Sequence, residues 1–284
     1  MKHKIALITD STCDIPREWI TQYDICVVPL TIVMKGETFT DGVDITPIEF
    51  YERLAAENLR PTTSQPAPKL FLDAYKKAAE DGYEQVLVIT ISSAMSGTIE
   101  SARRAAEESP IPVKIMDGKS NSMGIGWQVI AAARAREAGG GLTEMLAAAE
   151  QARSHMQYYI SLDTIEYLAR GGRIADAARF LNSILHIKPM IYVKHETGTV
   201  GAAIPSRSRK AAIEDLYKEF FRHIDTSLPL HITVLHNNAL PEAKELMERV
   251  IRDFSPKEIF ISIVSPVLGV HTGPRAIALC GYAG

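Results

Sequence analysis

The chain has 284 residues, the length of two ordinary domains. Hydrophobic residues make up 46% and charged residues 23%, the composition of a folded protein with a sizeable core. A net charge of −3 argues against nucleic-acid binding, which normally needs a basic surface, and no apolar run approaches the ~20 residues that span a bilayer. Cys13, Cys26 and Cys280 match neither a disulfide framework nor a metal site, so we expect a soluble cytoplasmic protein.

The first half of the chain alternates short β-branched segments with longer helical ones, a pattern typical of a mostly parallel sheet between helices. Thr46-Pro47-Ile48-Glu49 combines an N-cap Thr, a Pro at the first helical position and a Glu at the third, so a helix begins there. The run Gly139-Gly140-Gly141 ends another helix. The expected strands cover residues 4–9, 85–91 and 112–117, and further helices open at Pro16 and cover about residues 69–79 and 123–138.

The pattern changes near residue 155. A hairpin is expected over residues 187–194, with a turn at Glu196-Thr197-Gly198 and a return strand from Thr199, followed by strands over residues 230–235, 259–264 and 276–282. A hairpin among crossover helices implies a mixed sheet. We therefore predict an α/β protein with two domains, a three-layer α/β/α parallel-sheet domain over residues 1–155 and a mixed-sheet α/β domain over residues 156–284. Because no long linker separates them, the domains should pack closely around a cleft.

Two hydroxyl-rich segments of the first domain are candidate anion sites. Thr62-Thr63-Ser64-Gln65-Pro66 offers three consecutive hydroxyls, and its ordinary alternative is a capping segment for the helix that follows. Ser92-Ser93-Ala94-Met95-Ser96-Gly97-Thr98 follows a strand and opens a helix, which leaves backbone N–H groups free to bind an anion beside the Ser96 hydroxyl. A carboxylate fits both segments, whereas a plain helix N-cap with spare serines is the alternative for the second.

Basic side chains of the second domain add further candidates. His271 stands beside a Gly-Pro turn, so it is held on a rigid loop, where it is either a ligand contact or an ordinary histidine. Arg170 and Arg173 flank Gly171-Gly172; we expect Arg173 to tie the domains together and leave open whether Arg170 faces the anion. A small basic cluster opens a later helix and is either solvated charge or a docking patch: Arg207, Arg209 and Lys210.

Several catalytic patterns are missing from the sequence. No Gly- and Lys-rich run has P-loop spacing, and Gly124-Ile125-Gly126 lacks the third glycine of a dinucleotide fingerprint. Ala94 replaces the first glycine of a Gly-x-Ser-x-Gly elbow around Ser96. The histidines show no metal-ligand spacing. We therefore expect no cofactor, no metal and no catalytic residue.

Taken together, these motifs resemble those of the DegV family along essentially the whole chain. The resemblance is carried by the order and spacing of Asp10-Ser11-Thr12-Cys13-Asp14, Thr63-Ser64-Gln65-Pro66, Ser93-x-x-Ser96-Gly97-Thr98, Leu168-Ala169-Arg170-Gly171-Gly172-Arg173-Ile174, Ile187-Lys188-Pro189 and His271-Thr272-Gly273-Pro274. It implies a parallel-sheet domain followed by a mixed-sheet domain. It also implies a lipid-binding protein that is not an enzyme and that holds one long-chain fatty acid, such as palmitate, non-covalently between its domains.

The resemblance further implies residue roles. Thr63 and Ser96 become the pair that binds the carboxylate, and the acyl chain enters a tunnel in the second domain. Nearby ligand-binding candidates are Thr62, Ser93, His271 and Arg170. In some bacteria such a protein presents its fatty acid to a separate fatty acid kinase, which forms the acyl phosphate used in phospholipid metabolism. That kinase would dock at Arg207 and Arg209.

Two departures from the family pattern bear on these roles. Arg275 follows Pro274 where the family usually has glycine; a positive φ is unfavourable for Arg, so we expect an altered turn, and the added charge would strengthen the anion site. Ser206 precedes Arg207 where the family more often has Lys, which weakens the docking assignment. Apolar residues that either line the tunnel or face ordinary core are Phe180, Leu181, Ile184 and Leu185.

Two other functions stay open at this point. One is a Ser-dependent acyl hydrolase or transferase that uses Ser96 with His271, although no orienting acid is evident. The other is a triose-binding kinase subunit, since dihydroxyacetone kinases have a related fold. The hydrophobicity of the ligand distinguishes the lipid from the triose, and turnover by the protein alone distinguishes the carrier from the hydrolase.

Overall fold

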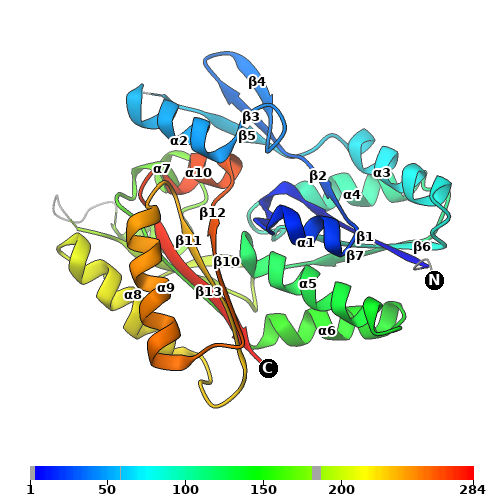
Figure 1. Cartoon of the computed structure of the whole chain (residues 1–284). Coiled ribbons are helices and arrows are strands. Elements are labelled where there is room, and N and C mark those ends of the chain that lie inside the picture. Colours follow the sequence, from blue (N-terminus) through cyan, green and yellow to red (C-terminus); the bar gives the residue numbers. More distant parts are fainter. Residues whose placement is uncertain (1–3, 58, 181–186) are drawn as a thin grey trace.

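The computed structural model describes residues 4–57, 59–180 and 187–284, and its strands form a parallel sheet, a mixed sheet and a small third sheet (Figure 1). The parallel sheet has the order β2-β1-β6-β7, and each of its three strand pairs is parallel. Its strands are β1 (Ile5–Asp10), β2 (Ile25–Val28), β6 (Gln85–Thr90) and β7 (Val113–Asp117). The parallel sheet expected from the sequence is therefore present.

Helices cover both faces of this sheet. Along β1, the side chains of Ala6 and Ile8 cluster with residues of α3 and α4, whereas those of Ile5 and Leu7 belong to the cluster that contains α5. This alternation follows from the two-residue period of a strand, and it explains why all six β1 residues are buried. The three-layer α/β/α arrangement is confirmed. The helices of this part are α1 (Arg17–Gln22), α3 (Pro68–Glu80), α4 (Thr98–Ala106), α5 (Met123–Glu137) and α6 (Leu142–Ser154).

The mixed sheet has the order β10-β9-β8-β13-β11-β12. β11 and β12 pair in parallel, and the other neighbours pair antiparallel, including the hairpin of β9 and β10. The expected mixed sheet is therefore confirmed, although β9 begins at Met190 rather than at residue 187. Its strands are β8 (Met156–Ser161), β9 (Met190–Lys194), β10 (Thr199–Ala202), β11 (Leu230–His236), β12 (Glu258–Ile263) and β13 (Ile277–Ala283).

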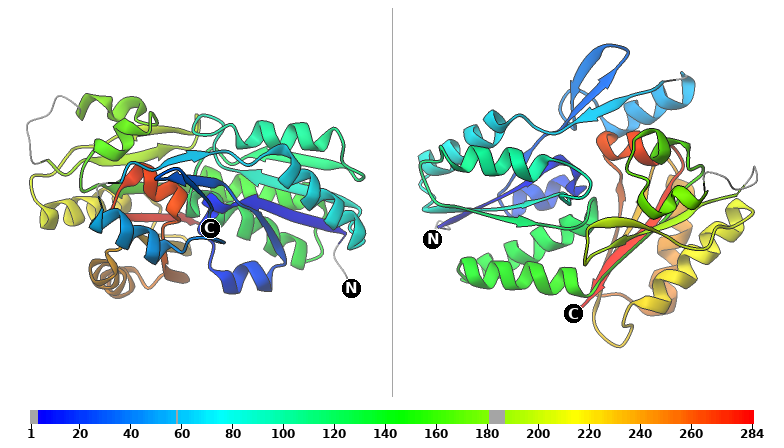
Figure 2. Two further views of the ribbon diagram at one scale, coloured as in Figure 1. Left: turned by 90° about the horizontal axis from the view of Figure 1, so that it is seen from above. Right: turned by 180° about the vertical axis from the view of Figure 1, so that it is seen from behind.

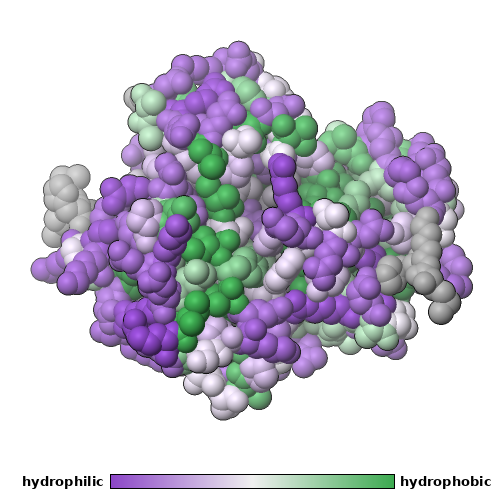
Figure 3. All heavy atoms as spheres, viewed as in Figure 1, coloured by the Kyte–Doolittle hydropathy of each residue, from purple (hydrophilic) through white to green (hydrophobic). Residues whose placement is uncertain are grey.

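Seen from behind, the parallel and mixed sheets lie next to each other, with the small sheet above the place where they meet (Figure 2). β12 is an edge strand of the mixed sheet, and its six residues are only partly buried. Apolar surface gathers along the middle of the face that carries this strand (Figure 3). No helix within the described ranges is long and apolar enough to cross a membrane.

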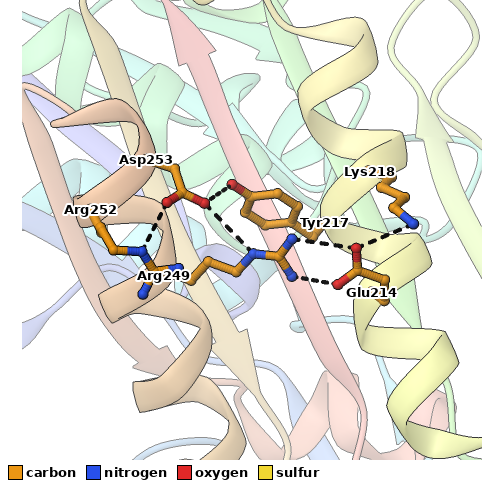
Figure 4. Close-up of polar contacts among 6 residues, drawn as sticks. All are labelled: Glu214, Tyr217, Lys218, Arg249, Arg252 and Asp253. Carbon is orange, nitrogen blue, oxygen red and sulfur yellow. Dashed lines mark hydrogen bonds and ion pairs between the residues drawn. The ribbon is translucent and has the colours of Figure 1, made fainter.

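Two helices, α8 (Arg209–His223) and α9 (Leu240–Phe254), cover the outer face of the mixed sheet and are joined by a polar network (Figure 4). Arg249 of α9 donates hydrogen bonds of 2.5 and 3.3 Å to the two carboxylate oxygens of Glu214 on α8. Its guanidinium lies 3.6 Å from the ring centroid of Tyr217, whose hydroxyl donates to Asp253 at 2.6 Å. The bidentate ion pair and the ring contact fix the two helices relative to each other.

The third sheet is small and antiparallel, with the order β4-β3-β5, and was not expected from the sequence. One of its strands is the hydroxyl-rich segment Thr62–Ser64, for which a helix cap was the alternative. That alternative is wrong, because α3 has Ala67 at its N-cap and no side-chain cap hydrogen bond. Pairing with β3 holds the segment instead. The strands are β3 (Thr31–Met34), β4 (Glu37–Thr40) and β5 (Thr62–Ser64).

The small sheet and α2 (Pro47–Ala56) lie over α10 (Pro266–Thr272), a helix from the other end of the chain (Figure 1). α2 begins as predicted, with the Thr46 hydroxyl accepting a hydrogen bond from Glu49 N at 3.2 Å. Its Tyr51 packs so closely on Gly269 of α10 that a Cβ there would lie 2.6 Å from the Tyr51 hydroxyl. The division at residue 155 stays a prediction, and the two halves share this contact.

Candidate ligand-binding site

A cavity of about 270 Å³ lies where the carboxyl ends of the parallel strands meet the inner face of the mixed sheet. Thr12 and Ile91, which closely follow β1 and β6, line one side of it. Residues of β5, α10 and five strands of the mixed sheet line much of the rest, together with loop residues that include Ser96 and Arg173. This is the position at which open α/β sheets bind their ligands.

The wall of the cavity on the side of the mixed sheet is apolar. Most of its residues occupy alternate positions of their strands, as the two-residue period requires, so mainly one face of the sheet points inward; Ile277, next to Ala278 on β13, also lines the cavity. Each of them is at most 6% exposed, and none carries a charge. These wall residues are Tyr158, Ile160, Ile191, Val193, Val200, Leu235 and Ala278. The wall suits a hydrocarbon chain.

The opposite end of the cavity is polar and contains the two hydroxyls singled out in the sequence. Thr63 of β5 and Ser96 both line the cavity and are partly buried. The Thr63 hydroxyl lies 3.0 Å from His271 Nε2, so these two candidates from opposite ends of the chain are in contact. The Ser96 hydroxyl lies 2.9 Å from that of Thr98, at the start of α4 as expected.

His271 lines the cavity from the last turn of α10, so it stands on a helix and not on the loop expected from the sequence. Burial, and secondarily the nearby Arg173 guanidinium, lowers the pKa of His271 to about 4, so the imidazole is neutral at pH 7. Its Nδ1 is buried without a hydrogen-bond partner among the described residues. The ring fits closely against Gly171, where a Cβ would lie 2.1 Å from Nδ1. A glycine at this position lets the imidazole reach Thr63.

Of the two arginines of the Arg-Gly-Gly-Arg segment, Arg173 and not the candidate Arg170 lies at the cavity. Arg173 lines the cavity and donates hydrogen bonds to Met95 O at 3.2 Å and Gly171 O at 2.7 Å. Arg170 lies outside the lining, pairs with Glu166 and stacks over the ring of Tyr167. The contact with Met95 does tie the two halves together, as predicted for Arg173, but it also places that guanidinium beside the polar end.

Thr62 and Ser93 do not line the cavity, although both were candidates. Thr62 is exposed on the small sheet. Ser93 is exposed and donates from its hydroxyl to Asp117 at 2.5 Å. Of the candidate tunnel residues, Phe180 is buried but absent from the lining, and Leu181, Ile184 and Leu185 lie outside the described residues.

The expectation for Arg275 is wrong in two respects. Its φ is +62°, so it adopts the left-handed conformation that we expected it to avoid. Its N–H donates to Asn237 O at 2.6 Å, which holds the backbone in that conformation. Its guanidinium lies 3.7 Å from Glu242 and outside the cavity lining, so the added charge does not strengthen the anion site. Glu242 also binds Arg209, whose side chain is only 17% exposed, whereas Arg207 is exposed.

The polar end combines hydroxyls with a positive charge. The Thr63 and Ser96 hydroxyls lie within hydrogen-bond distance of His271 and Thr98, and the Arg173 guanidinium adds the charge. Within the described parts of the chain, no hydrogen bond joins Ser96 to His271, because Thr98 and Thr63 are their respective partners. The same ranges contain no group of three or more His, Cys, Asp or Glu side chains placed to hold a metal ion.

The fold and the cavity thus define an α/β protein with an apolar chamber that ends in hydroxyls, an imidazole and a guanidinium. Residues 4–283 match the sequence model described as "Uncharacterised protein, DegV family", and the chain belongs to the DegV family. A DegV domain-containing protein of Streptomyces coelicolor is 34% identical, over 98% of both chains.

Solved structures of the family share the whole fold. A fatty acid-binding DegV family protein from Thermus thermophilus superposes with a TM-score of 0.91 and 32% identity, over 99% of this chain and 100% of the other. DegV of Bacillus subtilis, a fatty acid-binding protein, gives a TM-score of 0.90 and 29% identity, over 100% of both chains. Both similarities extend over the parallel and the mixed sheet.

Proposed function

We propose that the protein binds one long-chain fatty acid non-covalently, with the carboxylate at the polar end of the cavity and the acyl chain along the apolar wall. The observation that carries this proposal is the division of a single cavity into these two parts. Thr63 and Ser96 donate hydrogen bonds to the carboxylate, and Arg173 balances its charge. The similar proteins of T. thermophilus and B. subtilis are both described as fatty acid-binding, which supports the proposal.

The two parts of the cavity contribute differently to affinity. Burial stabilises an acyl chain by ~0.8 kcal/mol per methylene, so the fourteen or so methylenes of palmitate contribute ~11 kcal/mol. Immobilising the ligand offsets several kcal/mol of this gain. Each hydrogen bond to the carboxylate adds about 1.5–3 kcal/mol. The chain therefore supplies most of the affinity, while the polar end sets the orientation.

Titration of lipid-free protein tests this proposal. Palmitate should bind, hexadecanol of the same chain length should bind more weakly because it lacks the carboxylate, and dihydroxyacetone should not bind. Equal affinity for palmitate and hexadecanol would contradict the role of the polar end. Binding of dihydroxyacetone in place of palmitate would support the triose-binding alternative, which the wall disfavours because all of its side chains except Tyr158 lack hydrogen-bonding groups.

We also propose that the protein is a carrier in phospholipid metabolism, which presents the carboxyl group to a separate fatty acid kinase. Ser64 and Gln65 line the cavity and are exposed, so the polar end lies nearer the surface than the buried wall. A phosphate donor held by a partner can approach the carboxylate from that side. Arg207 is exposed and stays a docking candidate, whereas Arg209 is engaged by Glu242.

A reconstituted reaction tests the carrier role. With ATP, acyl phosphate should form only when this protein, palmitate and a bacterial fatty acid kinase are all present. Arg207→Ala should slow the reaction without changing fatty acid affinity. Acyl phosphate formation or ester hydrolysis by this protein alone, abolished by Ser96→Ala, would replace the carrier with an enzyme.

A further inference from the structure

Two buried aspartates hold the N-terminus of α10, the helix that carries His271. Asp14 Oδ1 accepts a hydrogen bond from Ser265 N at 2.9 Å, and Asp41 Oδ1 accepts one from Val267 N at 3.3 Å. Ser265 is the N-cap residue, yet its own side chain makes no cap hydrogen bond. The first N–H groups of a helix have no partner within it, so these carboxylates replace the usual capping side chain.

Both carboxylates are themselves fixed by second hydrogen bonds. The other oxygen of Asp41 accepts from the Ser11 hydroxyl at 2.7 Å, and that of Asp14 accepts from the Ser122 hydroxyl. Asp14 is 9% and Asp41 3% exposed, and burial raises the pKa of each carboxyl to about 7. A negative charge at a helix N-terminus is favourable, which offsets part of the cost of burying it.

The capped end and the ligand end of α10 are only two turns apart. The helix has seven residues, and His271 is the sixth of them. Val267 and Leu268, in its first turn, line the cavity, so a shift of this turn alters the cavity directly. Gly269 of α10 packs on α2, and the Thr63 hydroxyl lies 3.0 Å from His271 Nε2. A tilt of α10 about Gly269 therefore also moves the imidazole away from that hydroxyl. The first half of the chain thus holds both ends of α10.

We propose that Asp14 and Asp41 are positioning residues for the carboxylate site, because their capping of α10 sets where His271 meets Thr63. This role rests on the fatty acid site proposed above. Neither aspartate lines the cavity; both border a separate surface groove. A substitution at either position therefore reaches the ligand indirectly, through the segments that its carboxylate holds, of which α10 is one.

Carboxyl-labelled palmitate provides a direct readout, because the ¹³C chemical shift of its carboxyl carbon reports the hydrogen bonds that it accepts. Asp41→Ala should shift the bound carboxyl signal toward that of free palmitate and weaken binding by at most roughly tenfold, because a lost cap destabilises the helix and only part of that cost reaches the ligand. Asp41→Asn keeps an acceptor for Val267 N and should restore both values. Ser11→Ala, which loosens the Asp41 carboxylate and also removes the acceptor of Leu30 N, should shift the signal in the same direction by less.

The matched control is Ser208→Ala, which removes the N-cap of α8, a helix that does not line the cavity. It should lower the melting temperature and leave the carboxyl signal unchanged. An unchanged signal in both Asp41→Ala and Ser11→Ala, with palmitate bound, would overturn the positioning role. The same would follow if Ser208→Ala shifted the signal as much. A wild-type protein that shows only free palmitate would instead overturn the fatty acid site, and this proposal with it.

Discussion

Replacing Thr63 by Val removes one hydroxyl and little else from the polar end of the cavity. Val keeps the β-branched shape that suits β5, but it lacks the Oγ1 that lies 3.0 Å from His271 Nε2 and that we assign to the carboxylate. Loss of a hydrogen bond to a charged oxygen costs about 1.5–3 kcal/mol, so binding should weaken roughly 10- to 100-fold. Displacement of a fluorescent fatty acid measures the change.

Thr62→Val is the matched control, because Thr62 precedes Thr63 on the same strand, is exposed and does not line the cavity. Its affinity should equal that of the wild type. Circular dichroism should show that both variants keep the fold, so that a difference in affinity reports the site. Equal affinity for the two variants would refute the assignment of Thr63 to the carboxylate.

Three further outcomes follow. Arg173→Met should weaken palmitate binding in a competition titration while Arg170→Met leaves it unchanged, because only Arg173 lines the cavity; the reverse order would contradict the charge assignment. Arg249→Met should lower the melting temperature by a few degrees, since it breaks a partly exposed network worth about 1 kcal/mol, and should leave palmitate affinity unaffected. Burial acts to raise the pKa of Glu258, but hydrogen bonds from His231 and Arg134 lower this pKa to about 2, below its ordinary value of 4.5. The ionised Glu258 carboxylate therefore contributes its full stabilisation above pH ~4.5, and this contribution is lost as the pH falls toward 2. Tryptophan fluorescence during acid unfolding should show the loss of stability in the wild type but not in Glu258→Gln.

Short apolar runs and local caps were sufficient to predict the main elements. The apolar run of β1 and the N-cap at Thr46 depend on neighbouring residues only, and both appear in the structure. β5 was missed because three residues are too few to show a period and its partner β3 lies about thirty residues earlier in the chain. Short strands of this kind form only once a partner strand is in place.

The errors for the arginines at the candidate site arise from the course of the backbone. Arg170 and Arg173 are the same residue type in the same short segment, and which of them faces the cavity depends on the turn at Gly172, whose φ is +72°. Arg275 has φ +62° because a tertiary hydrogen bond to Asn237 holds its N–H, a constraint that no local rule contains. Thr63 and His271 are in contact although they are 208 positions apart in the chain. Only the resemblance to a family, and not their spacing, predicted that they belong to one site.

Native mass spectrometry of the protein as purified from cells tests the central claim most directly. An acyl chain enclosed by the apolar wall should leave slowly, because release loses the ~11 kcal/mol of free energy gained by burying its hydrocarbon. Each chain should therefore carry the added mass of one fatty acid of about sixteen to eighteen carbons, a range taken from the resemblance to the family, and denaturation should release that acid unmodified. An empty protein that also fails to take up palmitate or oleate would contradict the account, as would an acyl group attached covalently to Ser96.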